Sequence, residues 1–175
     1  TSDTRPGYLR RESSRTDRDV QVSVAVLSGR ESEALYGAPL AKKSIQPVWV
    51  KVENRGDRAY WLLSPGLDPN FFPASEAAEA IALDDPDADL DALDRRFREL
   101  AFKNPIMPGA TAAGFVLTNL HEGVKLVQID LFAEGQPALL LWDRGGGDTP
   151  AEIIVAGQRA ATPALAFMVR FGSGF

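Results

Sequence analysis

The chain has 175 residues, of which 45% are hydrophobic and 25% are charged, values typical of one globular domain and not of a disordered chain. Its formal net charge of -5 argues against nucleic acid as a partner, since binding phosphates requires an excess of Lys and Arg. Cysteine is absent, which excludes disulfides, thiolate metal sites and cysteine nucleophiles. The apolar runs fall short of the ~20 residues that cross a bilayer, so no transmembrane segment is expected in this chain.

Residues 1–18 are polar and carry five arginines with few large apolar groups. They predict a flexible N-terminal arm that is either a solvated linker or a contact to acidic lipid head groups. Residues 19–175 are expected to form a single domain.

The next segments alternate between apolar and polar residues with the period of two that is typical of β-strands. Strands are predicted over residues 19–28, 45–53 and 59–64. The polar segment 54–57, Asn-Arg-Gly-Asp, suggests a turn that joins the last two strands as a hairpin. Between the first two strands, residues 30–41 predict a helical turn that ends at Gly37.

From residue 73 to residue 102 the composition changes to Ala, Asp, Glu, Leu and Arg. One helix is predicted over residues 75–83 with Ser75 as its N-cap, and a second begins near Pro86 with Asp85 as its cap. Leu90, Leu93, Phe97 and Leu100 recur at spacings of three and four. This apolar stripe predicts that the second helix lies on the β-structure instead of projecting from it.

Residues 112–118 and 124–132 predict a second hairpin, and residues 138–143 a buried strand followed by a glycine-rich loop over 144–148. Residues 152–156 fit either a strand or the start of a helix, and residues 164–171 are likewise ambiguous. Short strands interrupted by one helical segment predict a mainly β protein. Its fold class is expected to be an antiparallel, immunoglobulin-like (Ig-like) β-sandwich with an α-helical insertion over about residues 74–102.

The run LYGAPLAKKSIQPVWVKVENRGDRAYWLLSPGLDPNFF resembles a region of bacterial extracytoplasmic proteins, some of which carry a C-terminal domain of the LssY type. The strand pair within it, and the later Pro-Gly turn followed by GFVL, also resemble Ig-like accessory modules of surface proteins. The resemblance implies a non-catalytic β-sandwich in the periplasm or at the cell surface, either secreted or membrane-tethered in the full-length protein. Its partner would be a protein or a cell-envelope component.

Aromatic residues are the candidate ligand-binding residues, because aromatic faces give rigid, amphipathic contact area. A platform for a sugar or a partner protein would use Trp49, Trp61, Phe71 and Phe72, with Trp142 as a further member. Trp49 is the strongest candidate because it is out of phase with the valine stripe of its strand. The alternative is that the helix with Leu90 and Phe97 covers Trp49, which would make the aromatics core residues.

No metal site, cofactor or catalytic residue is predicted. The acidic run with Asp85, Asp87 and Asp89 fails as a calcium loop because, counted from Asp85, Leu90 and Arg96 stand at the sixth and twelfth positions, where Gly and Glu are needed. His121 is the single histidine and lies in no zinc motif, and the glycine-rich loop lacks the Gly-Lys-Ser/Thr ending of a phosphate-binding loop. The sequence therefore predicts a non-catalytic binding or scaffold module. The alternatives are a hydrolase that uses carboxylates in the region 84–94, and a structural domain that docks on another part of a longer chain.

Overall fold

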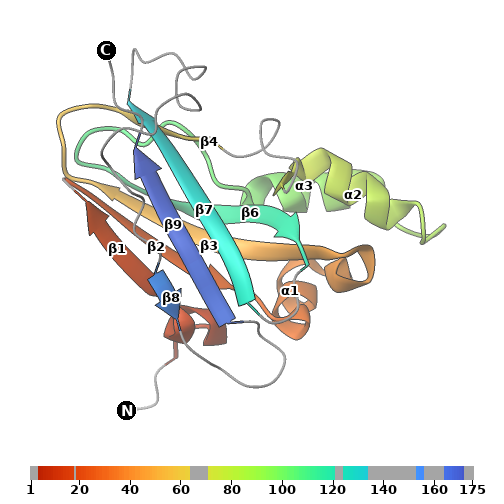
Figure 1. Cartoon of the computed structure of the whole chain (residues 1–175). Coiled ribbons are helices and arrows are strands. Elements are labelled where there is room, and N and C mark those ends of the chain that lie inside the picture. Colours follow the sequence, from red (N-terminus) through yellow and green to blue (C-terminus); the bar gives the residue numbers. More distant parts are fainter. Residues whose placement is uncertain are drawn as a thin grey trace, which may run out of the picture.

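The computed structural model describes residues 4–17, 19–63, 71–120, 124–133, 153–155 and 164–171. Figure 1 shows a β-rich body with helices against one side of it, so the fold contains both α and β structure. The elements in chain order are η1 (Gly7–Arg11), β1 (Ser13–Asp17), β2 (Val20–Val26), α1 (Gly29–Tyr36), η2 (Leu40–Lys43), β3 (Ile45–Asn54), β4 (Tyr60–Leu63), β5 (Phe71–Phe72), α2 (Ala74–Ala82), α3 (Leu90–Leu100), β6 (Thr111–Asn119), β7 (Val124–Ala133), β8 (Ile153–Val155) and β9 (Ala164–Phe171).

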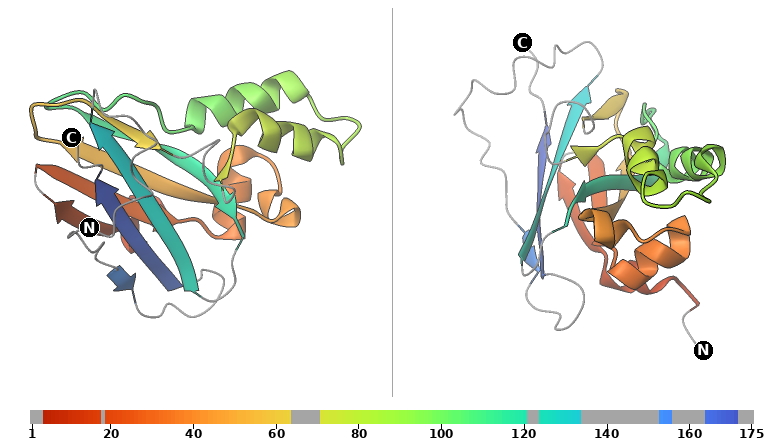
Figure 2. Two further views of the ribbon diagram at one scale, coloured as in Figure 1. Left: turned by 45° about the horizontal axis from the view of Figure 1, so that its top comes forward. Right: turned by 90° about the vertical axis from the view of Figure 1, so that its right-hand side faces the viewer.

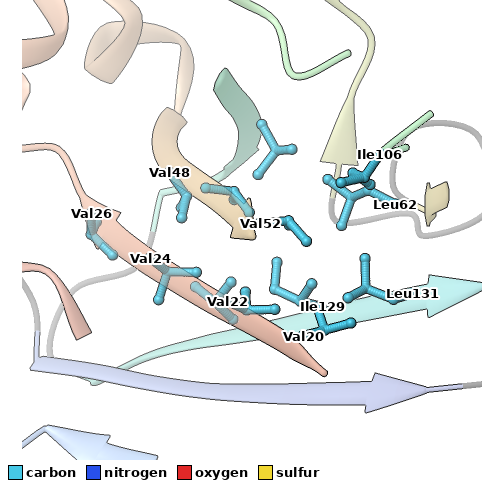
Figure 3. Close-up of a cluster of buried hydrophobic side chains, with 13 residues drawn as sticks. Val20, Val22, Val24, Val26, Val48, Val52, Leu62, Ile106, Ile129 and Leu131 are labelled. Carbon is cyan, nitrogen blue, oxygen red and sulfur yellow. The ribbon is translucent and has the colours of Figure 1, made fainter. Parts of the chain in front are cut away.

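The described strands form two sheets that share one hydrophobic core. The first sheet has the order β1-β2-β3-β6-β5 and the second the order β4-β7-β9-β8. In Figure 3, valines of β2 and β3 face Ile129 and Leu131 of β7, and Leu62 and Ile106 close one end of the cluster. The alternation of Val20, Val22 and Val24 with polar neighbours therefore identified the core face of β2 correctly.

Both predicted hairpins are wrong, although the strands themselves form. β3 pairs with β2 and β6, whereas β4, which was expected to be its partner, pairs with β7 in the other sheet. β6 and β7 also belong to different sheets. The alternation shows which side chains are buried, but it does not show which strands pair. Two consecutive strands can bury their side chains in the same core either as neighbours in one sheet or as members of two facing sheets.

The expected antiparallel pairing also needs a correction. Among the described strands, β7 and β9 run parallel, with Val127 opposite Phe167, whereas the other pairs are antiparallel. A parallel pair requires a long connection, and the 30 residues from 134 to 163 between β7 and β9 include β8. The ambiguous segments 152–156 and 164–171 are strands β8 and β9.

The outer face of the first sheet is covered by helices, which gives the molecule a third layer. The right-hand view in Figure 2 shows α1, α2 and α3 on the side of this sheet that faces away from β7 and β9. A second apolar cluster fills the space between the helices and the sheet, with Tyr36, Phe97 and Phe115 at its centre. The first sheet is thus apolar on both faces.

Residues 4–17 do not form the flexible arm that was predicted for residues 1–18. β1 pairs with β2 along its whole length, with Ser13 opposite Val24, and η1 places Tyr8 against Trp49 and Phe115. An edge strand is held by backbone hydrogen bonds, which require no apolar side chains of its own. The Ser14 and Ser23 hydroxyls add a hydrogen bond of 2.7 Å across the pair.

Side-chain caps mark where α1 and α3 begin, whereas α2 begins without one. α1 starts with a capping box, in which Ser28 and Glu31 each accept a hydrogen bond from the other's backbone N–H, and it ends at Gly37 as predicted. α2 begins at Ala74 after Pro73, so Ser75 is not its cap. α3 begins at Leu90 with Asp89 as its cap, later than predicted, because Asp85 instead accepts hydrogen bonds within a turn that precedes the helix.

Candidate functional site

A groove of about 700 Å³ opens between the helices, and it is the best candidate for a binding site in the described part of the chain. One wall is the connection from the end of α1 into η2, and the other is the α2–α3 hairpin. Its volume falls in the range of about 300–1,000 Å³ that is usual for ligand pockets. It is lined by Tyr36, Gly37, Ala38, Pro39, Lys42, Lys43, Ile81, Asp84, Asp85, Ala88, Asp89, Ala92, Leu93 and Arg96.

Two polar contacts hold the walls of the groove together. Lys43 of η2 forms an ion pair of 2.6 Å with Asp84, which follows α2. Arg96 of α3 donates hydrogen bonds from Nε and Nη2 to the carbonyl oxygen of Leu35 in α1, at 3.0 Å and 2.8 Å. The α2–α3 hairpin is therefore tied to η2 near one end of α2 and to α1 near the middle of α3.

The floor of the groove is apolar. The Tyr36 ring packs edge-on against Phe97 with ring centroids 4.7 Å apart, and Ile81 is also buried. Burial raises the pKa of Tyr36 far above its ordinary value of 10.0, an effect that the charge of Arg96 opposes only in part. The phenol is therefore neutral at physiological pH.

The groove wall formed by α3 carries charges of opposite sign at its two ends. Asp89, Leu93 and Arg96 are spaced by four and three residues, and all three line the groove, so they lie on one face of the helix. Asp85 is at the same end as Asp89, because the Ala88 N–H donates to the Asp85 carbonyl in the turn before α3. Along α3 and the turn before it, the hairpin end is acidic and the end beside α1 is cationic, whereas the facing wall carries Lys42 and Lys43, of which Lys43 pairs with Asp84.

The predicted aromatic platform is not assembled as one surface. Trp49 alternates with core valines on β3 and packs on the helix-covered face of the first sheet. Trp61 precedes the core residue Leu62 on β4 and therefore lies on the outer face of the second sheet. The two tryptophans face away from each other across the molecule. Phe72 packs on the same cluster as Trp49, and Phe71 lies beside it in β5.

Trp49 is half-buried, and the ring that lies against it comes from the N-terminal segment. Its centroid is 6.4 Å from that of Tyr8 in η1, and the ammonium of Lys51 lies 5.9 Å from the ring on the same strand. Phe97, which the alternative interpretation placed over Trp49, packs edge-on against Tyr36 instead. Trp49 is therefore not part of an open platform, and α3 is not the only element that contributes to its burial.

The apolar stripe of α3 lies on the body over only part of its length. Phe97 is buried, and Leu93 and Leu100 pack against the same cluster, but Leu90 is 42% exposed and Leu83, before the turn, is 84% exposed. The tip of the hairpin extends past the sheet, as the left-hand view in Figure 2 shows. This overhang provides the wall of the groove that the sequence did not predict.

The residues that line the groove were not identified as a site from the sequence. Lys42 and Lys43 lie in the segment 35–72 and were given no role, and Arg96 was considered as a residue that breaks the calcium-loop pattern. Within the described ranges, no three His, Asp or Glu side chains gather where they could share a metal ion. His121, Trp142, the predicted strand 138–143 and the loop 144–148 lie outside the described residues.

Comparisons with known proteins identify no relative: no protein-family model, curated protein or solved structure matches the chain. None of the helices that the structure describes is both long and apolar enough to cross a membrane.

Proposed function

We propose that this chain is a non-catalytic binding module whose ligand occupies the groove between η2 and the α2–α3 hairpin. We further propose that it is an Ig-like β-sandwich of a bacterial protein, located in the periplasm or at the cell surface, with a protein or cell-envelope component as its partner. The two-sheet core supports the Ig-like description, whereas the parallel β7–β9 pair and the helical layer depart from it. The location is supported by the resemblance of the segment 35–72 alone.

The groove is the observation that carries the proposal. It combines an apolar floor, formed by Tyr36, Ile81 and Leu93, with charged side chains at its rim, which is the usual composition of a ligand site. Its walls are tied together by the Lys43–Asp84 and Arg96–Leu35 contacts, so the shape is formed before a ligand arrives. A site formed in advance loses little conformational entropy on binding.

The alternative function, a carboxylate-dependent hydrolase, would use the same groove, since Asp84, Asp85 and Asp89 line it. These carboxylates have structural roles in the fold. Asp84 pairs with Lys43, Asp85 accepts a hydrogen bond from the Asp87 N–H, and Asp89 caps α3. All three are exposed, whereas a general acid usually needs an apolar site that keeps its carboxyl protonated. The geometry therefore favours binding over hydrolysis.

The test is a screen of small apolar and amphipathic molecules, followed by ¹H–¹⁵N spectra of the labelled protein. We expect several of them to shift amide signals of residues 36–43 and 81–96, and we expect Ala92→Trp to abolish these shifts by filling the groove. Arg95→Trp is the matched control, because Arg95 is exposed on the same helix and does not line the groove. Molecules that shift only signals elsewhere, or that bind the Ala92→Trp variant equally well, would refute the proposal.

A further inference from the structure

The charges along α3 restrict the kind of ligand that fits the groove. Asp89 and Arg96 are seven residues apart on the groove-facing side of the helix, so their backbone positions are separated by about 10 Å along its axis. Leu93 lies between them on the same face. On this scale, a complementary ligand has a cationic group and an anionic group separated by roughly 10 Å and joined by an apolar body.

Each end of the groove retains capacity for a charged group. A guanidinium has five N–H donors, and Arg96 gives two hydrogen bonds to the Leu35 carbonyl, so donors remain for a carboxylate. At the other end, the hydrogen bond from the Ala92 N–H occupies Oδ1 of Asp89. Its second oxygen, together with the Asp85 carboxylate, can accept N–H bonds from an ammonium group.

A short peptide with free termini has these dimensions. An extended chain advances about 3.3 Å per residue, so three residues place the terminal ammonium and carboxylate about 10 Å apart. We propose, on the basis of the binding function proposed above, that the groove binds short apolar peptides with free termini, with the ammonium at Asp85 and Asp89 and the carboxylate at Arg96. The apolar side chains of the peptide then lie on Leu93 and Ile81.

The experiment uses trileucine in four forms: with both termini free, N-acetylated, C-amidated, and blocked at both ends. Affinities are measured by ¹H–¹⁵N titration of the whole chain. We expect free trileucine to bind most tightly and each blocked terminus to weaken binding about fivefold, the scale of an exposed charge pair. The preference for free termini over blocked termini should diminish at high salt, because interactions between exposed charges are screened.

Variants assign each terminus to its end of the groove. Arg96→Gln should remove the preference for a free carboxylate, and Arg96→Lys should restore part of it. Arg95→Gln is the control, since it makes the same change of charge one residue away and outside the groove. Asp89→Asn should weaken the preference for a free ammonium while it keeps the helix cap, because Asn caps as well as Asp. Asp91→Asn is its control.

The outcomes separate this inference from the proposed function. If the four forms of trileucine bind equally, or none binds, while screened molecules still shift the groove signals, the groove binds ligands but not by their charged termini, and the inference is overturned. If Arg96→Gln and Arg95→Gln reduce affinity by the same factor, the effect is one of net charge, which also overturns the inference. If screened molecules never shift the groove signals, the proposed function itself fails.

Discussion

Gly114 in β6 is a position where one methyl group should disturb the whole helical layer. The segment that leads out of α3 crosses β6 here, and a Cβ at position 114 would lie 2.5 Å from Cα and 2.7 Å from N of Phe102. Both are backbone atoms, so no side-chain rotation can relieve the contact. The Phe102 N–H also donates a 3.0 Å hydrogen bond to the Phe115 carbonyl, which fixes the crossing segment on the strand.

The cost of Gly114→Ala can be worked out from this geometry. The segment has to retreat by about 0.9 Å to restore the 3.4 Å separation of an ordinary contact. Overpacking of this kind costs about 1–3 kcal/mol, and loss of the Phe102–Phe115 hydrogen bond adds about 1 kcal/mol. Replacing glycine also stabilises the protein by about 0.4–1 kcal/mol, because it lowers the conformational entropy of the unfolded chain. We expect a net destabilisation of about 1–3.5 kcal/mol.

The assay is urea denaturation followed by circular dichroism, with Gly29→Ala as the matched control. Gly29 is the first residue of α1, and a Cβ there meets only the Ala41 Cβ, at 3.5 Å, which is an ordinary contact. The same chemical change should therefore stabilise the protein by up to about 1 kcal/mol. If the free energy of unfolding of Gly114→Ala is within about 0.5 kcal/mol of the wild-type value, the close approach of the two backbones does not constrain position 114, and the prediction is wrong.

Two further predictions concern the N-terminal segment. Burial alone would raise the pKa of Glu31, but hydrogen bonds from Arg11 (2.5 Å) and from Ser28, with the charge of Arg11, lower it below the ordinary 4.5. A carboxylate whose pKa is lower in the folded state stabilises the protein above its unfolded pKa, and this contribution is lost as the pH falls through the folded value. The difference in free energy of unfolding between the wild type and Glu31→Gln should therefore be constant above about pH 5 and shrink on acidification. Denaturation at several pH values measures it. A difference independent of pH would contradict the lowered pKa of Glu31. Tyr8→Ala should destabilise the protein by about 1–3 kcal/mol and shift Trp49 emission to longer wavelength, because the ring that covers Trp49 is removed. Tyr8→Phe is the control and should change neither the stability nor the emission. Subtracting the emission of a Trp49→Phe variant isolates the signal of Trp49. If that signal is unchanged in Tyr8→Ala, Tyr8 does not shield the indole.

Much of the secondary structure could be predicted because the signals are local. The valines of β2 and β3 alternate and do face the core, and Gly37 ends α1 with a positive φ of 71°. The start of α3 was missed because Asp85 and Asp89 are equally good caps in sequence. Asp85 accepts a hydrogen bond from the Asp87 N–H in a separate turn, and Asp89 caps the helix.

The candidate site could not be predicted, since its parts come from distant segments. Lys43 and Asp84 are 41 positions apart, as their numbers show, and they meet only when the hairpin folds back over η2. The stripe from Leu90 to Leu100 was expected to lie flat, but its first turns extend past the sheet and form a wall. Similarly, Trp49 and Trp61 were grouped by residue type, and the two sheets place them on opposite faces.

Local patterns in the sequence predict the buried faces of β2 and β3 and the position of the helical segment, and the composition excludes cysteine chemistry. These properties follow from the period of the apolar residues and from composition, which act within a few residues of each position. The tertiary structure alone decided that β3 and β4 lie in different sheets, that residues 13–17 form an edge strand, and that a groove opens beside α3. The physical reason is that strand partners and cavity walls are chosen by packing among segments far apart in the chain, and a local pattern satisfies several such arrangements equally well.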